Sequence, residues 1–169
     1  MSKLKSYSAV LFDLDNTLVL TDELKRYRST GNWNRAISNL EKTHKPPGTR
    51  KLLRKIRKTY GMKLGVVTRT PRLYAEALLQ HHKLDVDSIV AHGEARRGKP
   101  HPDGIYLAAN QLDVPQEECI YIGDPDDGVD RTMAQLAGVS YLEIDWNIPG
   151  ASWSLVENAL EVLPKKTSA

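Results

Sequence analysis

The sequence predicts one α/β domain in which helices cover both faces of a doubly wound parallel sheet, giving three layers. Five short apolar segments recur along the 169 residues, and stretches with helical periodicity lie between them. Several polar residues also follow the apolar segments directly. Strands that alternate with helices are typical of parallel sheets, because a crossover between parallel strands is long enough to contain a helix.

The expected strands are short and rich in β-branched or aromatic residues. Their apolar residues do not alternate strictly with polar ones, which is typical of strands that are buried on both faces. They cover residues 8–13, 63–68, 88–92, 119–123 and 140–144.

The expected helices lie between these strands. In residues 49–60 the apolar positions form one stripe along a helix, and the six basic residues lie off that stripe. Thr49 suits the N-cap of this helix and Gly61 suits its C-terminal end. The other helical stretches are residues 71–83, 103–112, 130–137 and 152–163.

One segment does not fit the alternation of strands and helices. Residues 19–46 are polar and less regular, and we expect one short helix within them, at about 33–41. The Pro46-Pro47-Gly48 sequence closes this segment. We therefore expect a single domain over residues 1–169 with a small, cap-like helical insert at about 19–46.

Composition excludes several classes of protein. The single cysteine, Cys119, excludes an internal disulfide. No apolar run approaches the roughly 18 residues of a membrane-spanning helix. The first residues contain no long apolar region and no small-residue cleavage site, so we expect no secretory signal. These features predict a cytoplasmic protein that does not bind membranes.

Charge is unevenly distributed along the chain. Residues 1–70 carry 16 Lys and Arg against 5 Asp and Glu, a charge of +11, whereas residues 71–169 carry 8 against 16, a charge of −8. Two interpretations stay open. The basic half could be a solvated helix face, or it could attract a polyanion or a phosphate-bearing substrate.

Polar side chains follow three of the expected strands at the point where each strand ends. Asp13 and Asp15 follow the first strand. Thr68 ends the second strand and Asp124 follows the fourth. Ligands of such sheets bind beyond the carboxyl ends of the strands. Buried carboxylates there are costly to desolvate unless they are paired or bind metal, and three of them suit a hard ion such as Mg²⁺.

Four short motifs stand at these positions. They are Asp13-Leu14-Asp15-Asn16-Thr17, Val67-Thr68, the sequence GKPHPD at 98–103, and Ile122-Gly123-Asp124. Taken in this order, they resemble the motifs of the haloacid dehalogenase-like hydrolases, the third in the form found in phosphoglycolate-phosphatase-like members. The resemblance covers nearly the whole core. It implies a Rossmann-like core with strand order 3-2-1-4-5.

The resemblance also implies a role for each residue. Asp13 would attack the phosphoryl phosphorus and form an aspartyl-phosphate. Asp15 would protonate the leaving oxygen and then activate water. Thr68 would hydrogen-bond a phosphoryl oxygen, and Lys99 would offset the negative charge at the site. Mg²⁺ would be bound by the carboxylates of Asp13 and Asp124 and by the backbone carbonyl of Asp15.

The fourth motif departs from the family's common form. A second acid usually follows the first by four residues, where this chain has Gly128. The stretch from Asp130 to Gly138 has the family's spacing of acid, seven residues and glycine. Asp130 is therefore the expected fourth metal-site residue, and Asp126 and Asp127 are alternatives.

These motifs predict a Mg²⁺-dependent phosphatase that hydrolyses a phosphomonoester. Members of the family that cleave carbon–halogen bonds lack an acid at the position of Asp15. Arg69 follows Thr68 where many relatives have Asn or Gly, and it could bind the substrate phosphate or point to solvent.

The small insert predicts an open site. The 28 residues between Leu18 and Pro47 allow one or two short helices, whereas many relatives have a cap of four or more. The phosphorylated substrate could then be a small molecule, a nucleotide or a nucleic-acid end. A non-catalytic module that binds phosphate or a partner is the alternative from another functional class.

Overall fold

The computed structural model describes residues 6–164, and within them it contains a five-stranded, all-parallel sheet. The strand order is β3-β2-β1-β4-β5, as expected. The strands are β1 (Ala9–Phe12), β2 (Lys63–Val67), β3 (Ser88–Val90), β4 (Cys119–Gly123) and β5 (Ser140–Glu143). The predicted fold class is confirmed. The proposed domain limits, residues 1 and 169, lie outside the described residues.

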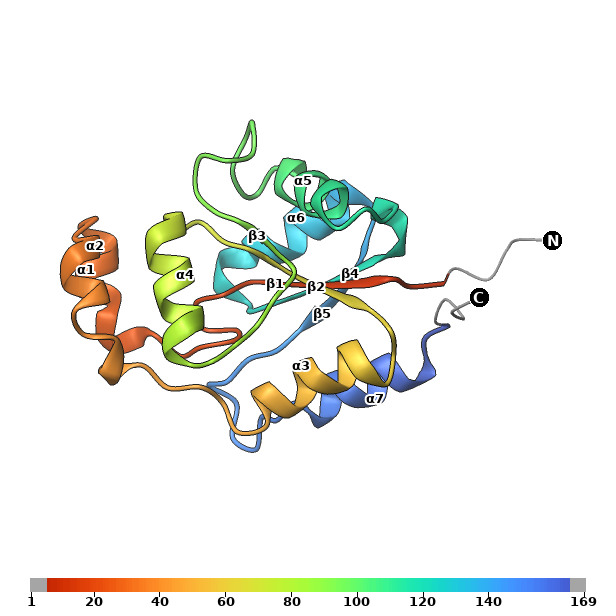
Figure 1. The fold of residues 1–169 in the computed structure, drawn as a ribbon, viewed down its shortest axis with the longest axis horizontal. Coiled ribbons are helices and arrows are strands. Elements are labelled where there is room, and N and C mark those ends of the chain that lie inside the picture. The colour runs from red at the N-terminus through yellow and green to blue at the C-terminus, as the bar shows by residue number, and fades with distance from the viewer. Residues whose placement is uncertain (1–5, 165–169) are drawn as a thin grey trace.

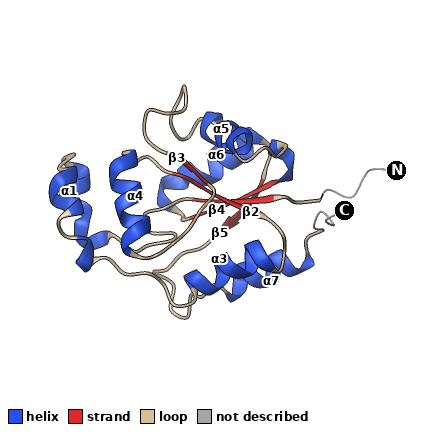
Figure 2. Ribbon diagram, viewed as in Figure 1, coloured by secondary structure: helices blue, strands red, loops and turns tan. Residues whose placement is uncertain are grey.

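Helices cover both faces of the sheet, so the domain has three layers (Figures 1 and 2). On one face lie α3 (Thr49–Lys58) and α7 (Ser154–Val162). On the other lie α5 (Asp103–Gln111) and α6 (Val129–Ala137). The helix α4 (Arg72–His81) stands between the sheet and the insert (Figure 1).

Both faces of β1 are buried, which explains why its sequence lacks alternation. Val10 and Phe12 pack in the apolar cluster that contains the residues of α3, α4 and α7. Ala9 and Leu11 pack in the cluster that contains those of α5 and α6. A strand between two apolar layers has a continuous run of apolar residues in its sequence.

The start of α3 differs by one residue from the prediction. Gly48, with φ of 84°, is the N-cap, and Thr49 is the first helical residue. The Thr49 hydroxyl donates a hydrogen bond to the Pro46 carbonyl and accepts one from the Trp153 indole, so it is not free to cap the helix. Gly61, with φ of 66°, follows the helix as expected.

The insert contains two short helices, α1 (Lys25–Ser29) and α2 (Trp33–Ile37), where we expected one at about 33–41. The 3₁₀ turns Asp22–Leu24 and Leu40–Lys42 flank them. Trp33 packs against Tyr74 of α4, with ring centroids 5.4 Å apart. The insert is therefore docked against α4 (Figure 1).

None of the helices between residues 6 and 164 has the length and the apolar character that crossing a membrane requires.

Candidate active site

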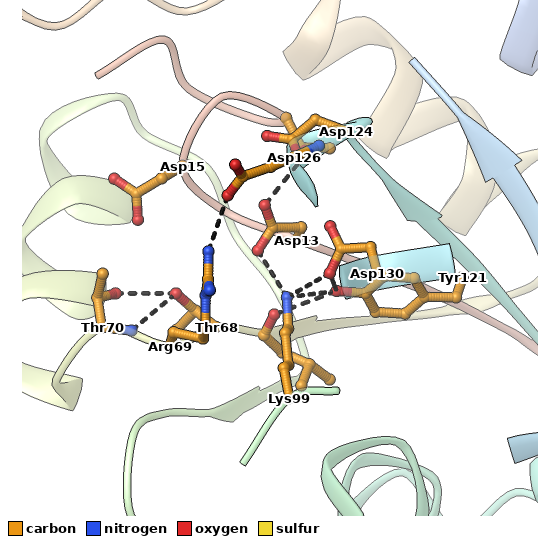
Figure 3. Close-up of polar contacts among 12 residues, drawn as sticks. Asp13, Asp15, Thr68, Arg69, Thr70, Lys99, Tyr121, Asp124, Asp126 and Asp130 are labelled. Carbon is orange, nitrogen blue, oxygen red and sulfur yellow. Dashed lines mark hydrogen bonds and ion pairs between the residues drawn. The ribbon is translucent and has the colours of Figure 1, made fainter. Parts of the chain in front are cut away.

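The parallel register of the sheet brings the polar ends of three strands together. Phe12 of β1 pairs with Val66 of β2 and with Ile122 of β4. The residues that follow these positions therefore meet at the carboxyl edge of the sheet (Figure 3). They are Asp13, Thr68 and Asp124.

Three carboxylates form the acidic cluster of this site. One oxygen each from Asp13, Asp124 and Asp130 lies within 4.8 Å of the other two. Asp130 lies in the first turn of α6, against the backbone of Gly123. A methyl group at Gly123 would lie 2.7 Å from the Cβ and Cγ atoms of Asp130, so only glycine fits there.

The alternatives for the second acid lie elsewhere or are not described. The Asp126 carboxylate forms an ion pair with Arg69 at 2.8 Å. Both of these side chains are about half exposed. The side chain of Asp127 lies outside the described part of the chain. Asp130 is thus the residue that the structure brings next to Asp13 and Asp124.

Lys99 lies against two of the three acids of the cluster, Asp13 and Asp130. Its amino group donates hydrogen bonds of 2.7 Å to Asp13, to Asp130 and to the hydroxyl of Tyr121 (Figure 3). Burial by itself would lower the pKa of Lys99, but the attraction of the two carboxylates outweighs it and raises that pKa. The lysine is therefore held as a cation between two acids.

The crowding of acids alters their proton affinity. Burial, followed by the charge of Asp13, raises the pKa of Asp124 to about 7. The same two causes raise the pKa of Asp130 to about 6, although Lys99 opposes the shift. A cation in the cluster would favour the ionised forms of both groups.

Thr68 is buried and has a fixed hydroxyl. Its oxygen lies 2.9 Å from the hydroxyl of Thr70 and accepts a hydrogen bond from the Thr70 backbone N–H. The neighbouring Arg69 points across the cleft to Asp126 (Figure 3). An exposed pair of this kind is worth about 0–1 kcal/mol, so a substrate anion can compete for the arginine.

The carboxylate of Asp15 points away from the acidic cluster (Figure 3). One of its oxygens accepts hydrogen bonds from Thr21 at 2.7 Å and from Tyr74 at 2.8 Å. Arg28 of the insert lies 3.3 Å from the same oxygen. The other oxygen is buried with no hydrogen-bond partner among the described residues. Burial raises the pKa of Asp15, although Arg28 opposes the shift.

Three residues of this arrangement were not among the expected ones. The hydroxyl of Tyr121 accepts a hydrogen bond from Lys99. Tyr121 directly precedes the fourth motif, and this position in the sequence indicates a residue close to the site. Arg28 and Tyr74 reach Asp15 from the insert and from α4. No spacing in the sequence indicates those two contacts, because they depend on how the insert and α4 pack around Asp15.

A cleft of about 340 Å³ opens at the carboxyl edge of the sheet. Asp13, Asp15, Thr68 and Asp124 line its base. The other lining residues come from the insert and from the segments after β1, β2, β4 and β5: Asn16, Leu20, Asp22, Lys25, Arg28, Arg69, Thr70, Pro125, Asp126, Asp145, Trp146 and Asn147. Trp146 is held there because its indole donates a 2.9 Å hydrogen bond to the Thr17 carbonyl.

The chain resembles known proteins in sequence and in fold. The model of the haloacid dehalogenase-like hydrolase family matches residues 23–144. Pyrophosphatase PpaX of Bacillus cereus is 33% identical over 98 residues, which is 57% of this chain and 44% of PpaX. The match thus spans less than half the length of that relative.

Two solved structures share the fold. CbbY from Rhodobacter sphaeroides, in complex with phosphate, has a TM-score of 0.71 at 21% identity, with 88% of this chain and 91% of that chain covered. A HAD-superfamily hydrolase of subfamily IA from Geobacter sulfurreducens has a TM-score of 0.67 at 19% identity, covering 86% and 93%. The family match extends over well more than half of the sequence, and the strand order agrees with it. The chain belongs to the haloacid dehalogenase-like hydrolase family.

Proposed function

We propose that this chain is a Mg²⁺-dependent phosphatase that hydrolyses a phosphomonoester through an aspartyl-phosphate on Asp13. The observation that carries the proposal is the acidic cluster together with Lys99, which pairs with Asp13 and Asp130. Phosphoryl transfer requires mainly a positioned nucleophile and charge stabilisation around the phosphoryl oxygens. Asp13, Lys99 and the buried Thr68 would supply both.

The donor set of the acidic cluster fits Mg²⁺. Carboxylate oxygens are the ligands that this ion prefers. The raised pKa values of Asp124, about 7, and Asp130, about 6, are those of carboxylates that lack sufficient positive charge nearby. Asp13 and Asp124 would bind the ion through their carboxylates, with Asp130 completing the set and Asp15 contributing its backbone carbonyl. The bound ion would supply positive charge next to the phosphoryl oxygens.

Asp13 would act as the nucleophile. Its Oδ1 atom accepts the hydrogen bond from Lys99, whereas its Oδ2 atom is contacted by the Thr17 hydroxyl at a long 3.4 Å. An Asp13 oxygen would attack phosphorus, the bond from phosphorus to the leaving oxygen would break, and Asp15 would give that oxygen its proton. Water would then attack the aspartyl-phosphate and pass a proton to Asp15, which releases phosphate and restores Asp13.

The other polar residues would hold the phosphate. The hydroxyl of Thr68 would donate to a phosphoryl oxygen, and Lys99 would offset the charge that gathers on the phosphate and on Asp13. Arg69 would join them after leaving Asp126, because an exposed ion pair holds it only weakly.

The open cleft can accept several classes of phosphorylated substrate. PpaX is named a pyrophosphatase and CbbY was solved with phosphate, and both names agree with a phosphorylated substrate. The short insert leaves room for a small phosphate ester, a nucleotide or a nucleic-acid end.

Removal of metal tests this proposal. Hydrolysis of p-nitrophenyl phosphate is expected to stop when EDTA is added and to return with excess Mg²⁺. Protons compete with Mg²⁺ for Asp124, whose pKa is about 7. The apparent affinity for Mg²⁺ is therefore expected to fall on the order of tenfold from about pH 8 to about pH 6. Calorimetric titration with Mg²⁺ at the two pH values measures this change directly.

Two outcomes would contradict the proposed Mg²⁺-dependent phosphatase activity. Turnover that survives complete chelation would remove the metal from the mechanism. Binding of phosphate without any turnover, across several phosphate esters, would instead indicate the non-catalytic module.

The insert is expected to assist Asp15. Arg28→Gln and Tyr74→Phe each remove a donor from the same oxygen of Asp15, so its carboxyl would be less well positioned. We expect kcat to fall about tenfold for an alkyl phosphate, whose leaving group needs a proton, and less for p-nitrophenyl phosphate. Steady-state kinetics with both substrates measures the difference.

Matched variants control for general damage to the fold. Arg26→Gln removes an exposed arginine that contacts the hydroxyl of Tyr27, and Tyr106→Phe removes a surface hydroxyl. Neither contact involves Asp15, so both variants should keep wild-type kinetics. An equal loss on both substrates in the Arg28 and Tyr74 variants would refute the positioning role.

A further inference from the structure

The helix α3 lies on the face of the sheet away from α5 and α6 (Figure 1). A basic groove of about 250 Å³ lies beside this helix. Its walls carry five basic side chains and a single acidic one. The lining residues are Arg50, Leu53, Arg54, Arg57, Lys58, Lys83, Leu84 and Asp85. We call this set the basic groove. None of its members lines the active-site cleft.

Most of the positive charge in the basic groove is not neutralised. Arg57 pairs with Asp85 at 2.8 Å and with Asp87 at 2.9 Å. The other four cations are exposed and form no ion pair or side-chain hydrogen bond with any residue from 6 to 164: Arg50, Arg54, Lys58 and Lys83. The groove therefore presents a net positive surface to solvent.

Local stability does not account for this charge. The ten residues of α3 include six basic side chains and no acidic one. Cations one helical turn apart repel each other. Arg50 and Lys51 also lie in the first turn, where the helix dipole disfavours positive charge. An anion in the groove would relieve both effects.

The arrangement suits a ligand with repeated negative charges. Arg50, Arg54 and Lys58 follow one another at intervals of four residues, so they form a row with steps of about 6 Å along the helix. A membrane surface is disfavoured, because a helix that lies on a bilayer inserts an apolar face. The apolar side chains of α3 are buried in the core.

The large apolar side chains that are exposed lie on other elements: Leu73, Tyr106, Leu136, Ile148, Leu155 and Val162.

We propose that the basic groove binds the phosphate backbone of a nucleic-acid strand.

A chain of contacts connects the row to the cleft. Arg50 follows Thr49, whose hydroxyl accepts a 2.8 Å hydrogen bond from the indole of Trp153. Trp153 packs edge-on against Trp146, with ring centroids 4.9 Å apart, and Trp146 lines the cleft. A strand in the groove would thus have one end, the one at Arg50, on the side of the cleft. Phosphate removal from that end rests on the proposed phosphatase activity, whereas binding in the groove does not.

The test is binding of a short, fluorescently labelled single strand that carries no terminal phosphate, followed by fluorescence anisotropy. The wild type is expected to bind with a log–log salt slope of about −0.7 for each phosphate contacted, or about −3 for four contacts. The double variant Arg54→Glu, Lys58→Glu should bind on the order of tenfold more weakly at low salt and reduce the magnitude of the slope by about 1.4, for two lost contacts. Arg54→Gln with Lys58→Gln should show a smaller loss, without introducing acids.

A double variant of equal charge change serves as the control. Arg35→Glu with Arg96→Glu reverses two exposed cations outside the basic groove, and it should retain wild-type affinity. Circular dichroism checks that every variant is folded.

Three results would overturn the inference. They are affinity unchanged in both groove variants, an equal loss in the control, and equally tight binding of a poly-glutamate peptide. Loss of binding with unchanged hydrolysis of p-nitrophenyl phosphate would uphold the groove and separate it from the catalytic proposal.

Discussion

Asp13→Asn is expected to lower kcat for phosphate-ester hydrolysis by at least about a thousandfold, the scale seen when a covalent nucleophile is removed. The side chain lies at the end of β1, where Lys99 bonds one of its oxygens. An amide keeps the shape of the carboxyl group but is a poor nucleophile. It also removes one charge from the acidic cluster, so the variant should fold normally.

The covalent intermediate gives a second readout. Acid-quenched wild-type enzyme should carry phosphate on the peptide that contains Asp13, as detected by mass spectrometry, and the variant should carry none. Asp113→Asn is the matched control, because Asp113 is exposed, has a φ of 53° that asparagine also tolerates, and does not line the cleft. Full activity in the Asp13 variant would refute the nucleophile assignment.

Lys99→Met is expected to reduce kcat by roughly 10²–10³-fold, the loss typical of removing one preorganised electrostatic group. The amino group is buried and donates to Asp13, Asp130 and Tyr121 at 2.7 Å each. Methionine has similar length without the charge. The repulsion between Asp13 and Asp130 would then lack its nearest counter-charge.

Two further variants test whether the positive charge and the shape of the Lys99 side chain are both required, and a third serves as a control. Lys99→Arg should not restore activity, because the broader guanidinium does not fit a buried position built around one amino group. Tyr121→Phe removes an acceptor for Lys99 and a donor to Asp130 but keeps the positive charge, so it should cost less than Lys99→Met. Lys45→Met, at a position that lines neither the cleft nor the cluster, should be neutral. Activity of Lys99→Met within about tenfold of wild type would contradict the electrostatic role.

The strands could be predicted from the sequence because burial on both faces leaves a strong local signal. The predicted limits of β2 and β4 agree with the structure to within one residue. The insert was harder, since α1 and α2 are only five residues each and contain few buried side chains. Helices that short are stabilised by docking rather than by their own periodicity.

The sequence alone does not decide which acid after β4 completes the acidic cluster. Asp126, Asp127 and Asp130 all follow Asp124 closely. The spacing from Asp130 to Gly138 favours Asp130, but it leaves Asp126 and Asp127 as alternatives. Contacts across the cleft separate two of them. Asp126 turns outwards to Arg69, 57 residues away in sequence, whereas Asp130 contacts Lys99, 31 residues away.

The sequence by itself determined the fold class, the strand order implied by the motifs and the set of polar residues at the strand ends. The fold class and the polar residues follow from local patterns, because buried parallel strands and the residues after them are contiguous in the chain. The strand order follows instead from the resemblance of the motifs to the family. Only the tertiary structure decided the direction of the Asp15 carboxylate and its contacts with Arg28 and Tyr74. Tyr74 is 59 residues from Asp15 and reaches it from α4, whereas Arg28 reaches it from the insert. Such contacts depend on packing between distant segments, and packing leaves no fixed spacing in a sequence.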